Sequence, residues 1–378
     1  MSAFKQKGKG PAPKPAPAPA KGKGKGKGKG AREESSSSSS SESEEEEEED
    51  VCIPLDDLIG DTTHLLTEER TVSVKGLELW SIRYFHQDFV GKERGTVVGL
   101  HGGPAFCHNY ILPLKLLANA GYTVILYDQV GCGRSTFVKE PLKSAPWLLT
   151  LEYYLEELKV VLGELWGLSE YYLYGSSWGT IMAQEFAVRE EEGFFQGKLL
   201  GLILDGALAD DKVYIETQWR DRISTLPTFT QKLLRKLTDE KRFDDPLYEF
   251  LDDQLSYHFT CRLLPPADAY LDSIEMHNPV IYAKMQGESE FTNGGVLLGW
   301  NIADRLHKVR CPAIVLVGEY DTMTIECSQQ VVDNIPGCWP LVVVPRSSHC
   351  KLLEEPHICI EHMIRFLDGC EEKRASEA

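Results

Sequence analysis

The stretch LYGSSWGT, residues 173–180, holds the pattern G-x-S-x-G with Ser177 at its centre. The aromatic and apolar run before it, EYYLY, predicts a buried strand. The run after it, TIMAQEFAVREEE at 180–192, has helical spacing and consists largely of good helix formers. A strand, a tight turn and a helix in this order predict a nucleophile elbow, a turn that presents a reactive side chain at the end of a sheet.

Two adjacent serines lie in this stretch, and the spacing distinguishes between them. A tight turn of this kind forces its central residue into a strained conformation, and side chains two positions away on either side would clash. Gly175 and Gly179 flank Ser177 at that distance, which selects Ser177 over Ser176. The pattern alone is equally compatible with a Gly-Ser turn that merely closes a strand, so the surrounding sequence has to support it.

Strand-like runs alternate with helical segments through most of the chain. The segments at 109–121 and 151–167 predict helices, and the segment at 70–85 predicts an antiparallel hairpin. The apolar runs that predict buried strands are 95–101, 122–128, 199–206, 312–321 and 340–349. This alternation predicts an α/β fold with a mostly parallel, doubly wound sheet that has the hairpin at its edge.

Composition divides the chain into segments. Residues 1–50 consist of Pro-Ala-Lys, Lys-Gly and Ser-Glu repeats that cannot bury an apolar face, so we predict a disordered tail there. We expect an α/β core made of 51–208 and 303–370. The intervening residues, 209–302, are charged, aromatic and helical in pattern, and predict a cap over the carboxyl ends of the strands. Residues 371–378 are expected to form a C-terminal tail.

Charge and cysteine content exclude several classes of protein. The chain has a formal net charge of −18, and an acidic folded part does not favour nucleic-acid binding. No apolar run approaches the ~18 residues of a membrane span, and the N-terminal stretch lacks the apolar region of a secretory signal. The ten cysteines include no C-x-x-C pair, which favours reduced thiols and a cytoplasmic location.

A serine nucleophile needs a base, and the base needs a carboxylate to orient it. In sheets of this kind the expected chain order is serine, acid, histidine. Asp321 and His349 each follow a predicted strand, at the edge of the sheet where the elbow points. Although a lone histidine is more often a packed or surface residue, this agreement predicts Ser177, Asp321 and His349 as a catalytic triad. Glu319 still lies within its strand and is the poorer choice of acid.

A reaction at a serine also needs donors for the negative charge that develops on the substrate oxygen. The first predicted donor is the backbone N–H of Trp178, directly after the nucleophile. The second is expected in the loop HGGPA at 101–105, where the glycines allow the backbone to approach a substrate closely. Pro104 has no N–H, and we predict Gly103 as the donor.

Together these motifs resemble the proline iminopeptidase family of α/β-hydrolases. HGGPA is similar to the HGGPG signature of that family, with Ala105 in place of the last glycine. YDQVGCGRS at 127–135 resembles its DQxGxGxS loop, and GSSWG, GEYD and SSH fall where its triad falls. The resemblance covers residues 55–368. It implies the α/β-hydrolase fold and a serine aminopeptidase that works without a metal or cofactor.

Such an aminopeptidase recognises a free α-ammonium, and a carboxylate in a partly desolvated pocket is the physical means of doing so. The family pattern includes a cap segment G-x-x-E-F, which this chain matches at Gly287, Glu290 and Phe291. The resemblance therefore implies Glu290 as the amine-binding residue. Family members often carry a second glutamate directly after the triad aspartate, whereas this chain has Thr322 there.

The function expected from the sequence is a serine aminopeptidase of prolyl aminopeptidase type. It would release an N-terminal proline or another small or apolar residue from a peptide, through an acyl-enzyme intermediate. An amidase acting on amino-acid amides, or an esterase or lactonase, would use the same triad. A non-catalytic interaction protein is a further alternative, which the complete triad argues against. The expected partner is a peptide or amino-acid amide, with no nucleic acid and no membrane.

Overall fold

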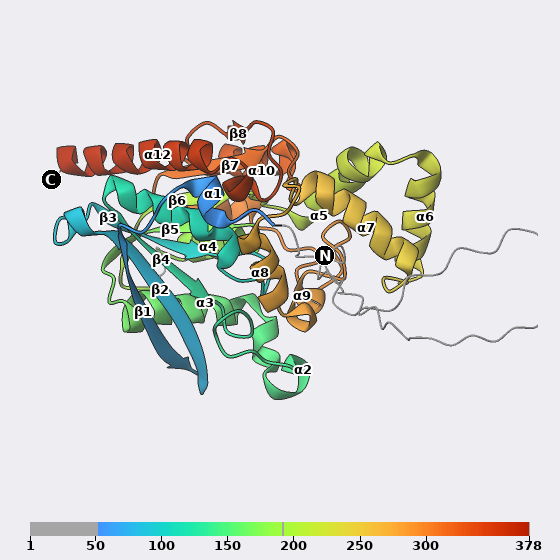
Figure 1. Ribbon diagram of the computed structural model, residues 1–378, viewed down its shortest axis with the longest axis horizontal. Coiled ribbons are helices and arrows are strands. Elements are labelled where there is room, and N and C mark those ends of the chain that lie inside the picture. The colour runs from blue at the N-terminus through green and yellow to red at the C-terminus, as the bar shows by residue number, and fades with distance from the viewer. Residues whose placement is uncertain (1–51, 191–192, 378) are drawn as a thin grey trace, which may run out of the picture. The chain divides into compact units, whose positions relative to one another are not determined.

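A computed structural model describes residues 52–190 and 193–377, so the tail predicted at 1–50 lies outside the described residues. The described chain forms an eight-stranded sheet in the order β1-β2-β4-β3-β5-β6-β7-β8 (Figure 1). The strands are β1 Leu65–Val74, β2 Leu77–His86, β3 Gly95–Leu100, β4 Tyr122–Asp128, β5 Glu170–Ser176, β6 Lys198–Asp205, β7 Ala313–Gly318 and β8 Val342–Val344.

The sheet is antiparallel at one edge and parallel elsewhere. β1 pairs with β2 and β2 with β4 in antiparallel fashion, whereas the five remaining pairs are parallel. The predicted mostly parallel sheet with a hairpin at its edge is therefore confirmed. β5 lies between β3 and β6, with Gly175 opposite Leu100 on one side and Leu204 on the other. The carboxyl end of β5 consequently opens between the loops that follow its two neighbours.

Helices cover both faces of the sheet, which confirms the doubly wound arrangement. One face packs against α3 Leu151–Lys159, α4 Trp178–Val188 and α10 Ile325–Asn334. The opposite face packs against α1 Leu55–Ile59, the 3-10 helix η2 Asn109–Ala120, α8 Asp268–Met276, α11 Lys351–Glu354 and α12 Pro356–Glu377. Each face buries its own apolar cluster, so the central strands are buried on both sides, as their near-continuous apolar sequence requires.

The chain between β6 and β7 is helical. It contains α5 Asp211–Thr217, α6 Thr228–Asp239, α7 Pro246–Phe259, α8 and α9 Pro279–Met285. The helices α6 and α7 extend to one side of the sheet (Figure 1) and contribute to an apolar cluster of their own. The two ends of the segment meet, because Ile302 N–H donates to the carbonyl of Ala209 at 2.9 Å. This closure is compatible with a cap at 209–302, and the division into core and cap stays a prediction.

Some boundaries differ from those expected. The helix predicted at 180–192 ends at Val188, and residues 191–192 lie outside the described part. Residues 371–377, expected as a tail, continue α12. They are held against β5, because the Tyr172 hydroxyl donates to Glu371 at 2.5 Å and Arg374 pairs with Glu170 at 2.5 Å. These partners lie about two hundred residues away in sequence, so composition could not reveal them.

The turn between β5 and α4 has the strained geometry that the sequence predicts. Ser177 has φ 55° and ψ −119°, in the region that side-chain-bearing residues rarely adopt. A Cβ added at Gly175 would lie 2.4 Å from the carbonyl oxygen of Gly179. A Cβ added at Gly179 would lie 2.1 Å from the carbonyl oxygen of Leu100 in β3. Both flanking positions therefore require glycine, as expected from the spacing.

Two further properties concern cysteines and membranes. All ten cysteines lie in the described residues and are free thiols. Across 52–190 and 193–377, no helix combines the length and the apolar character that a membrane crossing requires.

We predict that Gly179→Ala lowers the free energy of unfolding by about 1–3 kcal/mol or more, because the new methyl group can be accommodated only if backbone moves. Urea unfolding followed by circular dichroism measures the change. Gly294→Ala is the matched control, since a Cβ there meets nothing within 4 Å. Equal stability of the two variants would contradict the close approach at Gly179.

Candidate active site

Ser177 lies at the N-terminus of α4 and opens onto a small cavity with both predicted oxyanion donors, Gly103 and Trp178. The free volume of this cavity is about 10 Å³, roughly the room that one water molecule needs. Its other lining residues are Ile181, Leu208, Asp211, Tyr214, Gln286, Asn293, Leu297, Trp300 and Met323. The sheet thus supplies the serine and its loops, and the helical segment between β6 and β7 supplies most of the remaining wall.

Asp321 and His349 lie together at the carboxyl ends of β7 and β8. The distance from His349 Nδ1 to Asp321 Oδ1 is 2.6 Å, and both side chains are buried. Glu319, the alternative acid, is exposed and accepts from the backbone N–H of Arg346. The structure therefore pairs His349 with Asp321, the acid chosen from the sequence.

The backbone that follows β6 contacts both the elbow and the imidazole of His349. Ser177 N–H donates to the carbonyl of Asp205 at 3.0 Å. The next residue, Gly206, is so close to the histidine that a Cβ there would lie 3.0 Å from His349 Cε1. Ser177 and His349 consequently flank the same short piece of backbone.

Charges around this pair set its protonation. Burial alone would raise the pKa of Asp321, but the Lys351 ammonium at 2.9 Å and the His349 imidazole hold it well below its usual range. Burial alone would lower the pKa of His349, yet the Asp321 carboxylate raises it above its ordinary value. Because Asp321 is ionised and can only accept, His349 carries its proton on Nδ1 and presents Nε2 as a base.

The loop 101–105 offers few backbone donors. The N–H of Gly102 donates to the Tyr110 hydroxyl at 2.7 Å, and Pro104 has no N–H. This leaves Gly103, which lines the cavity with Ser177, as the donor that best fits. Ala105 has φ 60°, a left-handed conformation that explains why glycine is common at this position in the family pattern.

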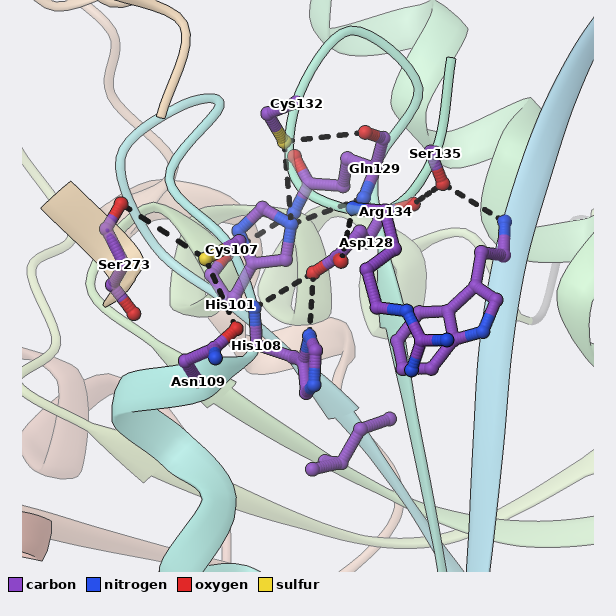
Figure 2. Close-up of polar contacts among 12 residues, drawn as sticks. His101, Cys107, His108, Asn109, Asp128, Gln129, Cys132, Arg134, Ser135 and Ser273 are labelled. Carbon is purple, nitrogen blue, oxygen red and sulfur yellow. Dashed lines mark hydrogen bonds and ion pairs between the residues drawn. The ribbon is translucent and has the colours of Figure 1, made fainter. Parts of the chain in front are cut away.

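The motif at 127–135 holds this loop in place (Figure 2). Asp128 Oδ1 accepts from the backbone and the ring of His108 at 2.8 and 2.9 Å, and Oδ2 accepts from Arg134 N–H at 2.8 Å. Burial alone would raise the pKa of Asp128, but His108 lowers it below its ordinary value. A buried, ionised carboxylate thus fixes two loops, a role that the sequence motif alone did not specify.

Gln129 connects the same loop to the elbow. Its backbone N–H donates to His101 Nε2 at 3.0 Å, and its side-chain amide donates to the His101 carbonyl at 3.1 Å. Its side-chain oxygen accepts from the indole of Trp178 at 3.0 Å. One residue therefore sets the spacing between the two segments that carry the predicted oxyanion donors.

Glu290 lies in the helical segment, and only 7% of its surface is exposed. Each of its two carboxylate oxygens is within hydrogen-bonding distance of a tyrosine hydroxyl. Tyr282 donates to Oε2 at 2.7 Å, and the hydroxyl of Tyr214, which lines the Ser177 cavity, contacts the Glu290 backbone carbonyl most closely and lies 3.1 Å from Oε1. Burial raises the pKa of Glu290, and the charge of His349 opposes that increase. The geometric link to the active site is Tyr214, which contacts Glu290 and lines the cavity beside Ser177.

Thr322 occupies the place of the second family glutamate and carries no charge. It is buried, with its hydroxyl 3.5 Å from Asp321 Oδ1. Nearby, Arg222 donates to the carbonyl of Asp321 at 2.8 Å. Arg222 thus places a positive charge beside Thr322, at the position where the family pattern often has a second glutamate.

This geometry suits acyl transfer. An ionised acid contacts a buried imidazole, the imidazole lies beside the same backbone as a strained serine, and the two residues predicted as backbone donors line the cavity at that serine. A carboxylate held by two hydroxyls adds a negative group at the helical side. These groups come from segments that are distant in sequence. Folding brings them together near the carboxyl ends of the strands.

Comparison with known proteins places this arrangement in a family. Residues 91–356 match the family described as serine aminopeptidase, S33. The chain is 29% identical to a proline iminopeptidase of Thermoplasma volcanium over 80% of this chain and 97% of that protein. It is 31% identical to one of Saccharolobus solfataricus over 72% and 84% of the two chains.

A solved structure agrees with these sequence matches. The crystal structure of a proline iminopeptidase of Mycobacterium smegmatis superposes with a TM-score of 0.71 and 30% identity, covering 81% of this chain and all of that one. The chain is therefore a serine hydrolase that belongs to the S33 serine aminopeptidase family of α/β-hydrolases, the proline iminopeptidase family.

Proposed function

We propose that this protein is an aminopeptidase that releases a small or apolar N-terminal residue, such as proline, from a peptide or amino-acid amide. The observation that carries the proposal is the buried Glu290 carboxylate, which contacts two tyrosines, one of them lining the cavity beside Ser177. A neutral ester carries no positive group with which a carboxylate at that place could pair. It would, however, pair with the α-ammonium of a peptide.

In the proposed reaction, His349 takes the proton of the Ser177 hydroxyl as the serine attacks the substrate carbonyl. Asp321 keeps the imidazole in the required tautomer and stabilises the imidazolium that forms. The N–H groups of Gly103 and Trp178 bind the oxyanion. The imidazolium then gives its proton to the leaving amine, and a water molecule, activated by the same histidine, releases the acyl group from Ser177.

The small cavity supports a small first residue. Its free volume of about 10 Å³ admits no amino-acid side chain unless lining residues move. Trp300 and Leu297 form part of the wall and offer apolar surface to a compact ring or methyl group. A bulky aromatic first residue would require the largest displacement and is expected to be the poorest substrate.

Ser177→Ala should remove nearly all turnover, by about 10⁶-fold in kcat, because it removes the nucleophile. Ser176→Ala is the matched control and should retain much of the activity, since Ser176 is the last residue of β5 and precedes the strained position. Steady-state kinetics on proline and alanine arylamides measure both variants. An inactive Ser176 variant beside an active Ser177 variant would refute the assignment.

Glu290→Gln keeps the shape of the side chain and removes its charge. A charge-assisted hydrogen bond is worth about 1.5–3 kcal/mol, so kcat/KM on free-amine substrates should fall about ten- to a hundredfold. The matched comparison uses N-acetylated substrates and simple esters, which have no ammonium and should be almost unaffected. If the parent enzyme cleaves free and acetylated substrates equally and the variant slows neither, an esterase or lactonase is the better description.

The acid limb of the pH profile should have its midpoint above about pH 6.5, the ordinary value for histidine. His349 must be neutral to act as a base, and its pKa is raised by Asp321. Activity is therefore lost as the pH falls through this raised pKa. The profile of kcat/KM on a neutral ester measures it without interference from the substrate amine, and a midpoint at or below 6.5 would contradict the prediction.

A further inference from the structure

A fully buried lysine contacts the acid of the proposed triad. Lys351 is the first residue of α11, two positions after His349, and its side chain is 0% exposed. Its ammonium lies 2.9 Å from Asp321 Oδ2 and 2.5 Å from Asp205 Oδ1. It also donates to the backbone carbonyl of His349 at 3.1 Å. One ammonium thus holds both the side chain of the acid and the backbone of the base.

The second carboxylate ties this lysine to the elbow strand. Asp205 ends β6, and its Oδ2 accepts from the Tyr174 hydroxyl of β5 at 2.5 Å. The Asp205 carbonyl accepts from Ser177 N–H. A continuous set of polar contacts therefore runs from the strand that carries the serine, through Asp205 and Lys351, to Asp321.

Lys351 acts on Asp321 from the side opposite to the histidine. Asp321 Oδ1 accepts the hydrogen bond from His349 Nδ1, and Oδ2 forms the ion pair with the Lys351 ammonium. With one oxygen fixed by the lysine, the carboxylate is restrained from rotating away from the imidazole. The ammonium also repels the positive charge that His349 acquires on protonation.

Other ionisable groups also face this set, among them Arg222 of the helical segment, which donates to the Asp321 carbonyl at 2.8 Å. Glu290 interacts with His349 from the helical segment, and Glu354 of α11 interacts with Lys351. The thiol of Cys359 in α12 contacts the Lys351 carbonyl at 3.5 Å. The lysine is thus faced mainly by two carboxylates, one of which belongs to the proposed triad.

We propose that Lys351 is a positioning residue for catalysis, which orients Asp321 on His349 and keeps the imidazole unprotonated at lower pH than Asp321 alone would allow. This inference rests on the triad assigned under the proposed function and is independent of the amine site at Glu290. A lysine that served only to compensate buried charge would affect stability and leave unchanged the limiting rate at pH values where His349 is neutral.

The test compares Asp205→Asn with the double variant Asp205→Asn/Lys351→Met. The two proteins differ only at the lysine. Because Asp205 is already neutralised in both, removing the lysine does not leave two buried carboxylates facing each other without a cation. The readout is the pH dependence of Ser177 modification by a fluorophosphonate, which requires the base but no ammonium site. Thermal unfolding and circular dichroism confirm that each variant is folded.

We expect the midpoint of the double variant to lie higher than that of Asp205→Asn by about one pH unit, since a nearby like charge no longer opposes protonation of His349. Its limiting rate should fall about tenfold, because Asp321 is less well oriented. Lys115→Met, at a half-buried lysine in η2, is the matched control and should leave the midpoint unchanged. Equal midpoints in the two folded variants would overturn the inference.

Asp205→Asn alone keeps the test decisive if the double variant does not fold. Without Asp205, the ammonium is less neutralised, and the midpoint should shift below that of the parent protein. An unchanged midpoint would overturn the inference. Absence of labelling in the parent protein would instead overturn the triad assignment and the inference with it, whereas normal labelling without aminopeptidase activity would refute only the amine site.

Discussion

The close approach of the backbone at Gly179 to the carbonyl oxygen of Leu100 is the constraint on which the site depends. It leaves no space for a Cβ atom, which would lie 2.1 Å from that oxygen. The turn after β5 is thereby held against the end of β3, and the loop that begins at His101 faces the elbow. The serine can meet backbone donors from another strand only because these two segments are so close.

Buried ionic groups fix the loops that the sheet alone would leave loose. Asp128 holds the segments around His108 and Arg134 on one side of the elbow, and Lys351 joins two carboxylates on the other (Figure 2 shows the first group). Charges buried in this way are costly unless they are paired and hydrogen-bonded. Here each is paired between segments that are distant in sequence, so that the buried charges hold those segments together.

The proposed reacting groups and the proposed amine-binding group come from different parts of the fold. Ser177, Asp321 and His349 follow strands of the sheet, whereas Glu290 and the tyrosines that contact it, Tyr214 and Tyr282, come from the helical segment between β6 and β7. Thr322, directly after the acid, is neutral, and its hydroxyl lies 3.5 Å from Asp321 Oδ1 while Oδ1 also keeps its contact with His349.

The sequence by itself determined the alternating strands, the mostly parallel sheet with its edge hairpin and the glycine requirement at the elbow, because these depend on local spacing and on the rule that parallel strands share a carboxyl edge. The sequence excluded Glu319 as lying within its strand, whereas β7 ends at Gly318 and it is the contact with His349 that distinguishes Asp321. Only the tertiary structure decided the contacts of Asp128, of Lys351 and of the two tyrosines on Glu290, and the helical form of 371–377. These depend on contacts between segments distant in the chain, for example between Tyr214 and Glu290 or Arg374 and Glu170. A buried polar side chain acquires its role from the partner that folding places beside it, and no local pattern specifies that partner.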